Sequence, residues 1–263
     1  MYPITDATQY RISTPLPPKR IISLVPSISE TVCHLASNRR LVGITRFCVH
    51  PKSALKGIRK IGGTKNPDIQ TIRELNPDLV LANAEENTKE IFDEIRAHRI
   101  PLHVGFPKSV DTALEDLRNV GTLLHEPKRA QEVYDNIQLL RAKRWKPFRY
   151  VYLIWNKPLM AISSDCFISS LLAEIGGVNL IKATDTRYPN VSKEMLSHLP
   201  VDCVFLSSEP YPFKEKHRQL LCSSLHMPIE RFQCIDGEFC SWHGVRMLPG
   251  LQYLQNWRSQ QCF

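Results

Sequence analysis

Several features that mark common protein classes are missing from this 263-residue chain. It has no GxSxG, GxGxxG, Walker or HExxH motif, so the signatures of hydrolases, dinucleotide-binding enzymes, P-loop NTPases and zinc proteases are absent. Its eight cysteines form no CxxC pair, which predicts mostly buried, reduced thiols. No window reaches the roughly 18 apolar residues of a membrane span. We therefore expect a protein that is not an enzyme and has no membrane insertion.

Charge is plentiful but scattered. The chain carries 34 Lys and Arg against 26 Asp and Glu, a net charge of +8. A basic balance allows binding to nucleic acid, a membrane surface or an anionic ligand. No basic run alternates with aromatics, however, so we expect no nucleic-acid partner. The first 20 residues contain no apolar core of a signal peptide. As written, the sequence predicts a cytoplasmic protein; the alternative is a periplasmic one whose export signal has been removed.

Apolar strands alternate with helices along the chain. RIISLVPS is typical of a strand, followed by a helix that Ser27 or Ser29 caps, with Glu30 in its first turn. LVGIT, NPDLVLANA and PLHVGF predict further strands, and NTKEIFDEIRAHRI predicts an amphipathic helix. This alternation indicates a parallel sheet covered by helices on both faces. The second half repeats the same order of elements, which favours a pseudo-repeat over chance similarity of two α/β halves.

A candidate bridging helix lies between the halves, in EPKRAQEVYDNIQLLRAKRWKP. Its apolar residues are spaced 3-4-3, as on one side of a helix: Ala130, Val133, Ile137 and Leu140. Pro127 can start this helix and Pro147 can stop it. A helix of about 18 residues is roughly 27 Å long, enough to join two lobes stiffly. An ordinary surface helix of a single domain is the alternative.

Five motifs resemble one family: RIISLVPSISET, VGITRFCVHP, IGGTKNPDIQTIRELNPDLVLANAEEN, RYPNVSKEML and DGEFCSWHGVR. Together they are similar to the helical-backbone substrate-binding proteins of ABC importers for cobalamin, haem and ferric siderophores, and closest to cobalamin-binding members without an export signal. The resemblance implies an α/β fold of two Rossmann-like lobes, with a ligand cleft between them. It places an N-terminal lobe at 1–125, the bridging helix at 126–147 and a C-terminal lobe at 148–263.

The resemblance also implies a partner. Family members dock on an ABC permease through one acidic residue on each lobe. The second-lobe position falls on Glu194, but the first-lobe position falls on Gln70, where a carboxylate would be expected. The scheme with two carboxylates is therefore in doubt for this chain.

Candidate ligand-binding residues follow the predicted strands, because ligands of parallel sheets bind at the carboxyl ends of strands. The aromatic ones offer flat apolar faces to a corrin or porphyrin. The predicted set is Pro26, Ser27, Phe47, His50, Glu86, Asn87, Trp155, Glu209, Tyr211, Phe239 and Trp242. Several alternatives stay open: helix capping for Ser27, an acidic surface loop for Glu86 and Glu209, core packing for Trp155, and packing under the C-terminal helix for the loop around Phe239.

Two Cys/His pairs are weak candidates for metal ligands. Cys48 and His50 are two residues apart on a loop, and Cys240 and His243 have an i, i+3 spacing that brings both to one metal if it is helical. His50 and His243 are the predicted metal ligands.

The sequence as a whole predicts a non-catalytic binding protein. It would need no cofactor, and its ligand would be a small metal complex: a corrinoid first, haem or a ferric siderophore next. A cytosolic metallochaperone or an enzyme that uses the same cleft is the alternative.

Overall fold

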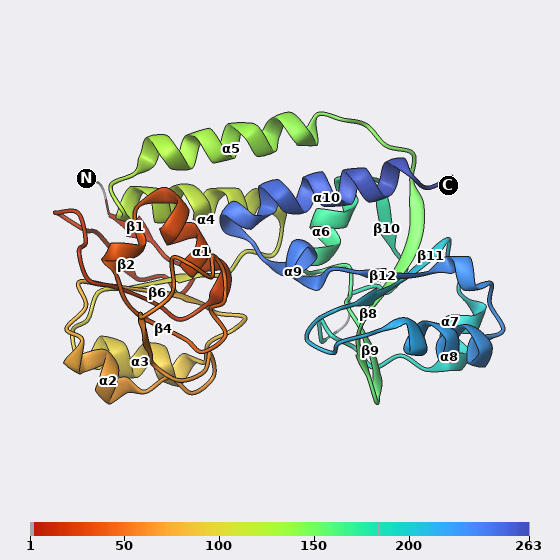
Figure 1. The fold of residues 1–263 in the computed structure, drawn as a ribbon, viewed down its shortest axis with the longest axis horizontal. Helices are drawn as coiled ribbons and strands as arrows, with labels where there is room; N and C mark the ends of the chain where they lie inside the picture. Colours follow the sequence, from red (N-terminus) through yellow and green to blue (C-terminus); the bar gives the residue numbers. More distant parts are fainter. Residues whose placement is uncertain (1–2, 184, 263) are drawn as a thin grey trace. The chain divides into compact units, whose positions relative to one another are not determined.

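The computed structural model describes residues 3–183 and 185–262 and divides into two compact units. Unit 1 comprises the chain up to Pro107 together with Asp111–Asn136 and Trp242–Arg246. Unit 2 comprises Lys108–Val110, Ile137–Ser241 and the chain from Met247 onward. Each unit is an α/β structure with its own sheet, and both are drawn in Figure 1. The predicted α/β fold class is thereby confirmed.

The sheet of unit 1 consists of five parallel strands in the order β5-β4-β3-β6-β7. Their bounds are Ile21–Ser23 for β3, Leu41–Ile44 for β4, Arg59–Lys60 for β5, Leu79–Asn83 for β6 and Leu102–Gly105 for β7. All residues of β3, β6 and β7 are buried, as expected for parallel strands covered on both faces. A short antiparallel hairpin, β1 (Ile4–Thr5) with β2 (Arg11–Ile12), precedes this sheet in the chain.

The helices between these strands follow the sequence pattern. They are α1 (Pro26–Leu35), α2 (Ile69–Glu74), α3 (Lys89–Ala97) and α4 (Val110–Leu123). The predicted caps of α1 were wrong. Its N-cap is Val25, which forms no side-chain cap, and both serines lie inside the helix with no acidic residue in its first turn. The helix begins earlier because Pro26 suits the first helical position, where its missing N–H has no intrahelical partner.

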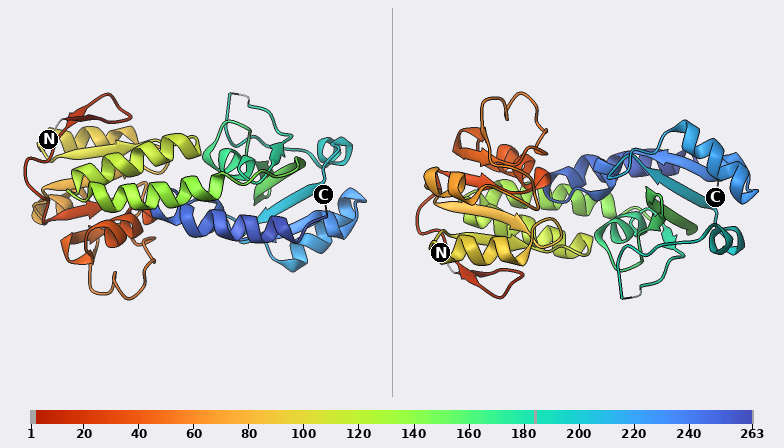
Figure 2. Two further views of the ribbon diagram at one scale, coloured as in Figure 1. Left: turned by 90° about the horizontal axis from the view of Figure 1, so that it is seen from above. Right: turned by 90° about the horizontal axis from the view of Figure 1, so that it is seen from below.

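The predicted bridging helix is α5, Pro127–Arg141. It starts at the predicted proline but ends six residues before Pro147, so it is about 22 Å long at 1.5 Å per residue. Ala130, Val133 and Ile137 are buried, whereas Leu140 is only partly buried. Most of α4 and α5 belongs to unit 1, and the two helices run next to each other (Figure 2). A Cβ added to Gly121 of α4 would lie 2.3 Å from Cβ of Ala130, so the glycine is needed for this close approach.

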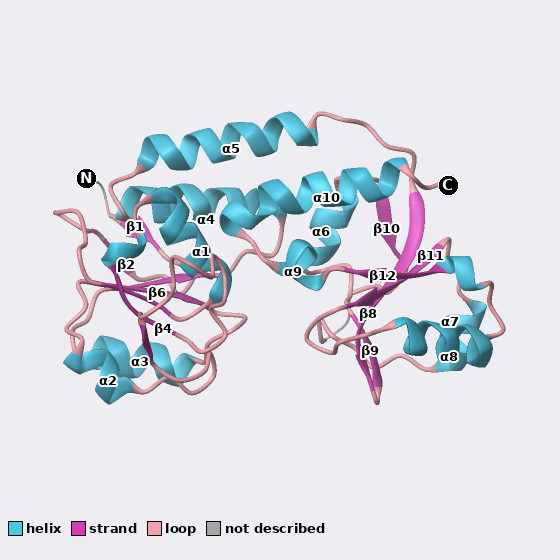
Figure 3. Ribbon diagram, viewed as in Figure 1, coloured by secondary structure: helices cyan, strands magenta, loops and turns pink. Residues whose placement is uncertain are grey.

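Unit 2 has a sheet of five strands: β8 (Phe148–Asn156), β9 (Leu159–Ala161), β10 (Gly177–Asn179), β11 (Cys203–Ser207) and β12 (Phe232–Ile235). Four are parallel in the order β10-β8-β11-β12, and β9 pairs antiparallel with β8. The helices, coloured in Figure 3, are α6 (Phe167–Ala173), α7 (Lys193–His198), α8 (Glu215–Leu225), α9 (Gly237–Ser241) and α10 (Met247–Ser259). A continuous apolar core joins β8 and β11 to α7 and α8.

The two sheets share one topology. The order β4-β3-β6-β7 in unit 1 matches β10-β8-β11-β12 in unit 2, strand for strand along the chain. This agreement supports the pseudo-repeat over chance similarity. It also makes the loops after β3 and β8, and those after β6 and β11, equivalent in the two units. No helix in the described part of the chain is both long enough and apolar enough to cross a bilayer.

Candidate functional site

In unit 1, the predicted residues lie near the carboxyl ends of β3, β4 and β6: Pro26 and Ser27 begin α1 after β3, and the others lie on the loops after β4 and β6. Phe47 follows β4 with its side chain 49% exposed, and Glu86, after β6, is also exposed. Ser27 and Asn87 are buried. The amide of Asn87 accepts from the backbone N–H of Asn83 at 2.9 Å and donates to the carbonyl of Thr64 at 2.8 Å. Asn87 therefore ties two loops together, and Phe47 offers the exposed apolar surface.

A segment from the far end of the chain, Trp242–Arg246, completes unit 1. Nε2 of His243 lies 3.0 Å from Nδ2 of Asn83 and 3.5 Å from Oγ of Ser27. Nε of Arg246 donates to Oε2 of Glu30 at 2.7 Å. Together these bonds fasten the segment across the start of α1 and the end of β6.

Charge is distributed unequally around buried His243. Burial lowers the pKa of His243, and the nearby Asp116 carboxylate only partly offsets this effect. Burial also opposes ionisation of Asp116, but its 2.8 Å hydrogen bond to His103 and the electrostatic effect of that histidine outweigh burial and lower its pKa. At neutral pH, His243 is therefore neutral and Asp116 is charged. With Asn83 donating its amide hydrogen, Nε2 of His243 acts as an acceptor.

Aromatic rings and guanidinium groups meet beside this segment. The rings of His50 and Trp242 are in edge-to-face contact with centroids 5.8 Å apart. Arg246 lies 5.0 Å from the ring centre of Trp242, and Arg46 lies 5.0 Å from that of Phe47. Of the predicted residues, Phe47 and His50 thus share the loop after β4, and His50 packs against Trp242. A guanidinium group lies beside the ring of Phe47 and another beside that of Trp242.

In unit 2, a second aromatic cluster gathers at the carboxyl ends of β8 and β11. Trp155, at 40% exposure, contacts Tyr211 edge-to-face with centroids 5.6 Å apart. Tyr211 in turn contacts Phe213, with centroids 4.8 Å apart. The alternative of core packing for Trp155 is therefore wrong, because the residue is exposed rather than buried.

Two other predicted residues of unit 2 are engaged in local packing. Oε1 of Glu209 accepts a 2.7 Å hydrogen bond from Ser241 of α9. The ring of Phe239 stacks on Tyr253 of α10, with centroids 5.1 Å apart and planes at 27°. The segment around Phe239 therefore packs against the C-terminal helix, which is the alternative left open by the sequence.

The metal prediction gains no support from the geometry. Helix α9 ends at Ser241, so Cys240 and His243 do not share a helix as the i, i+3 argument required. Burial raises the pKa of the Cys240 thiol, and its hydrogen bond with Tyr152 only partly offsets this effect. The thiol of Cys48 accepts from Oγ of Ser29 at 3.0 Å. Within residues 3–183 and 185–262, no three His, Cys, Asp or Glu side chains are grouped so as to hold a metal ion.

The two predicted docking residues occupy equivalent helices. Asp68 caps α2 and Ser192 caps α7, each accepting from the backbone N–H three residues on. Gln70 and Glu194 are thus both second residues of short, capped helices, and both are exposed. The equivalence supports the alignment of the two positions, while docking itself stays a prediction.

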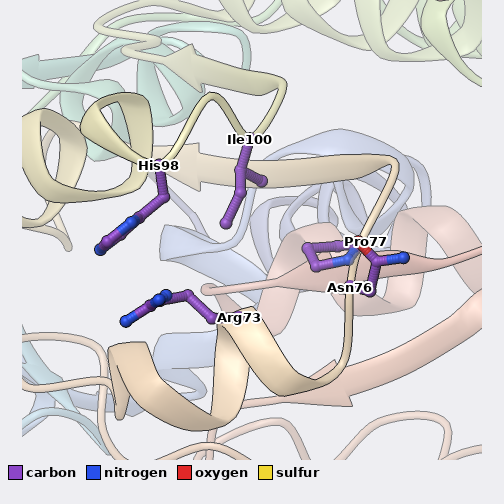
Figure 4. Close-up of a pocket in the computed structure, with 5 residues that line it drawn as sticks. All are labelled: Arg73, Asn76, Pro77, His98 and Ile100. Carbon is purple, nitrogen blue, oxygen red and sulfur yellow. The ribbon is translucent and has the colours of Figure 1, made fainter.

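One pocket of unit 1, of about 220 Å³, is lined by Arg73, Asn76, Pro77, His98 and Ile100. Figure 4 shows the side chains of Arg73 and His98 on the same side of this pocket. Asn76 and Pro77 precede β6, and Ile100 precedes β7, so the pocket lies at the amino ends of these strands. None of the predicted binding residues lines it.

Sequence reasoning missed the residues that hold the predicted ones in place. Asn83 is the last residue of the buried strand β6. In the sequence, only its position as a polar residue at the end of an apolar run sets it apart. His217 and Asn156 both contact the hydroxyl of Tyr211, although neither stands in a motif. Asn156 and Tyr211 are 55 residues apart, and contacts between residues that distant leave no local pattern.

Comparison with known proteins gives consistent matches. The sequence profile of a family described as periplasmic binding protein matches residues 21–220. A vitamin B12-binding protein of Vibrio cholerae is 24% identical over 202 residues, 74% of this chain and 73% of the relative. The crystal structure of the periplasmic vitamin B12-binding protein of Vibrio cholerae superposes with a TM-score of 0.79 at 20% identity, covering 94% of this chain and 100% of the other. A periplasmic haem-binding protein from Roseiflexus gives a TM-score of 0.77 at 20% identity, covering 92% and 97%.

Proposed function

We propose, since this chain belongs to the periplasmic binding protein family, that it is a non-catalytic binding protein for a flat metal-bearing molecule. A corrinoid is the first candidate, and haem or a ferric siderophore comes next. One observation carries the proposal: in each unit an exposed aromatic residue, Phe47 or Trp155, lies at the carboxyl end of a parallel strand. Such rings bury large apolar areas against a flat ligand, and strand ends are the usual place for ligands in this fold class.

The chemistry of these clusters suits a macrocycle with polar edges. Phe47 and Trp242 in unit 1 and Trp155 in unit 2 offer apolar ring surface. Exposed Arg46 places a guanidinium group beside the ring of Phe47, where it can hydrogen-bond to amide or carboxylate oxygens. Arg246, beside Trp242, is buried and paired with Glu30. The similar proteins of Vibrio cholerae are named for vitamin B12 and that of Roseiflexus for haem, which supports both candidates. Nothing in this scheme requires a cofactor.

A permease is the proposed partner, and Glu194 and Gln70 are the proposed docking positions on α7 and α2. The family name fits the periplasmic alternative for location and gives no support to the cytoplasmic expectation. We therefore propose delivery of the bound molecule to an ABC permease from the periplasmic side.

Titration of the purified protein tests the binding function. Cyanocobalamin, dicyanocobinamide and haemin are each added while absorbance and heat are followed. We expect at least one to bind with a Kd well below 100 μM, a threshold equivalent to about −5.5 kcal/mol. Failure of all three to bind below that threshold contradicts the proposal.

Two single variants test the aromatic clusters, one in each unit. Phe47→Ala and Trp155→Ala are each expected to weaken binding of the tightest of these ligands roughly tenfold, since a buried aromatic contact contributes on the order of 1–2 kcal/mol. Leu16→Ala is the matched control, because Leu16 is also exposed but precedes β3 at its amino end. Equal affinities in all three variants would place the ligand elsewhere.

A further inference from the structure

A chain of hydrogen bonds in unit 2 begins at the first turn of α8. The backbone N–H of Lys214 donates to Nδ1 of His217 over 2.9 Å. Because a backbone amide is always the donor, Nδ1 carries no proton in this arrangement. Burial, together with the charges of Lys216 and Lys214, lowers the pKa of His217 below its ordinary value of 6.5. The ring is therefore neutral at pH 7, with its proton on Nε2.

The hydroxyl group of Tyr211 receives the next hydrogen bond. Nε2 of His217 lies 3.1 Å from the hydroxyl oxygen, so the ring N–H donates and the oxygen accepts. The side-chain amide of Asn156 donates to the same oxygen over 3.2 Å. A phenolic oxygen has two accepting positions and one proton to donate. Both accepting positions are filled, and across the described ranges no acceptor takes the hydroxyl proton of Tyr211.

The surroundings of this hydroxyl are aromatic, and Tyr211 as a whole is partly buried. Trp155 meets the ring of Tyr211 edge-to-face, and its own N–H donates to the carbonyl of Lys157 at 3.2 Å. The indole therefore presents its apolar ring rather than an unused donor. Phe213 and His217 lie against Tyr211, with centroids 4.8 and 5.3 Å away, and both are buried. These contacts hold the ring of Tyr211 in one orientation.

We infer that His217 is a positioning residue that leaves the hydroxyl proton of Tyr211 free to donate to the bound ligand. This role rests on the proposed function and requires a particular ligand. The ligand must carry an oxygen acceptor on its rim, next to the flat part that meets Trp155. An amide carbonyl on a corrin and a carboxylate on a porphyrin both satisfy it. Asn156 completes the arrangement by filling the second accepting position of the oxygen.

Four variants test this arrangement, with cyanocobalamin and haemin as separate probes of amide and carboxylate acceptors. Tyr211→Phe is expected to weaken binding about 3- to 10-fold, the loss of one hydrogen bond. Asn156→Asp is expected to cause a similar loss, because a carboxylate accepts the hydroxyl proton instead of donating to the oxygen. Lys157→Gln is its matched control: it shifts the net charge by the same amount one residue away and keeps the backbone carbonyl, so affinity should be unchanged. His217→Gln should match Tyr211→Phe.

The double variant distinguishes a positioning role of His217 from a separate contact between His217 and the ligand. The double variant Tyr211→Phe/His217→Gln should bind no more weakly than either single variant, since both changes remove one interaction. In the ligand-free protein, ¹⁵N NMR should show His217 protonated on Nε2 and not on Nδ1 at pH 7. An additive double variant, an unchanged Asn156→Asp or the other tautomer would each overturn the inference. If the wild-type protein binds neither probe, the proposed function is contradicted instead. The tautomer of His217 in the ligand-free protein still tests the hydrogen-bond chain in that case.

Discussion

Replacing Ile137 by alanine is expected to lower the free energy of unfolding by about 2–5 kcal/mol. Ile137 is fully buried on α5, so the truncation removes apolar contacts and leaves a cavity. Helix α5 has 15 residues, and a helix of that length gains most of its stability in water from such burial rather than from its own hydrogen bonds. Urea denaturation followed by circular dichroism measures the change.

Leu139→Ala is the matched control for this prediction. Leu139 is two residues away on the same helix but 73% exposed, and the same kind of truncation there should change stability by less than about 0.5 kcal/mol. If the two variants unfold at the same urea concentration, the buried stripe does not anchor α5. The apolar stripe predicted from the sequence would then not stabilise the fold.

Replacing Gly244 by alanine is expected to cost about 2–5 kcal/mol, as the sum of two effects. Gly244 has φ of +74°, a conformation that costs other residues about 1–2 kcal/mol. An added Cβ would also lie 2.2 Å from Oγ1 of Thr31, and such overpacking costs roughly 1–3 kcal/mol. Thr31 cannot simply turn away, because its hydroxyl donates to the carbonyl of Ser27 and accepts from the N–H of Val245.

Gly57→Ala separates the two effects. Gly57 has a similar φ of +83°, but nothing lies within 4 Å of an added Cβ. This variant should therefore lose only the conformational part, about 1–2 kcal/mol. Thermal or urea unfolding of both variants gives the comparison. Equal losses would mean that Trp242–Arg246 is not packed tightly against α1 in unit 1.

Much of the fold could be predicted because its signals are local. The buried runs that became β6 and β7, and the spacing of Ala130, Val133 and Ile137 on α5, need only neighbouring residues to be recognised. The family resemblance was confirmed for the same reason, since its motifs run along most of the chain. Helix ends were less predictable: α1 begins at Pro26 rather than after a serine cap, and α5 ends before Pro147.

The site was less predictable because its contacts join distant parts of the chain. Nothing near His243 in the sequence indicates that it packs with Asn83 and Ser27, more than 150 residues earlier. The i, i+3 spacing of Cys240 and His243 resembled a metal pair only on the assumption of one continuous helix. The exposed aromatics, Phe47 and Trp155, were recognisable because each lies at or just after the end of a predicted strand.

Recovery of an unchanged ligand tests the central claim most directly, since the claim is binding without catalysis. The protein is incubated with excess cyanocobalamin or haemin and freed of unbound ligand by gel filtration, and the bound material is extracted for mass spectrometry. The account predicts that at least one of the two is retained at one molecule per chain and recovered with its mass unchanged. Retention of neither, or recovery of a chemically altered product, would contradict it.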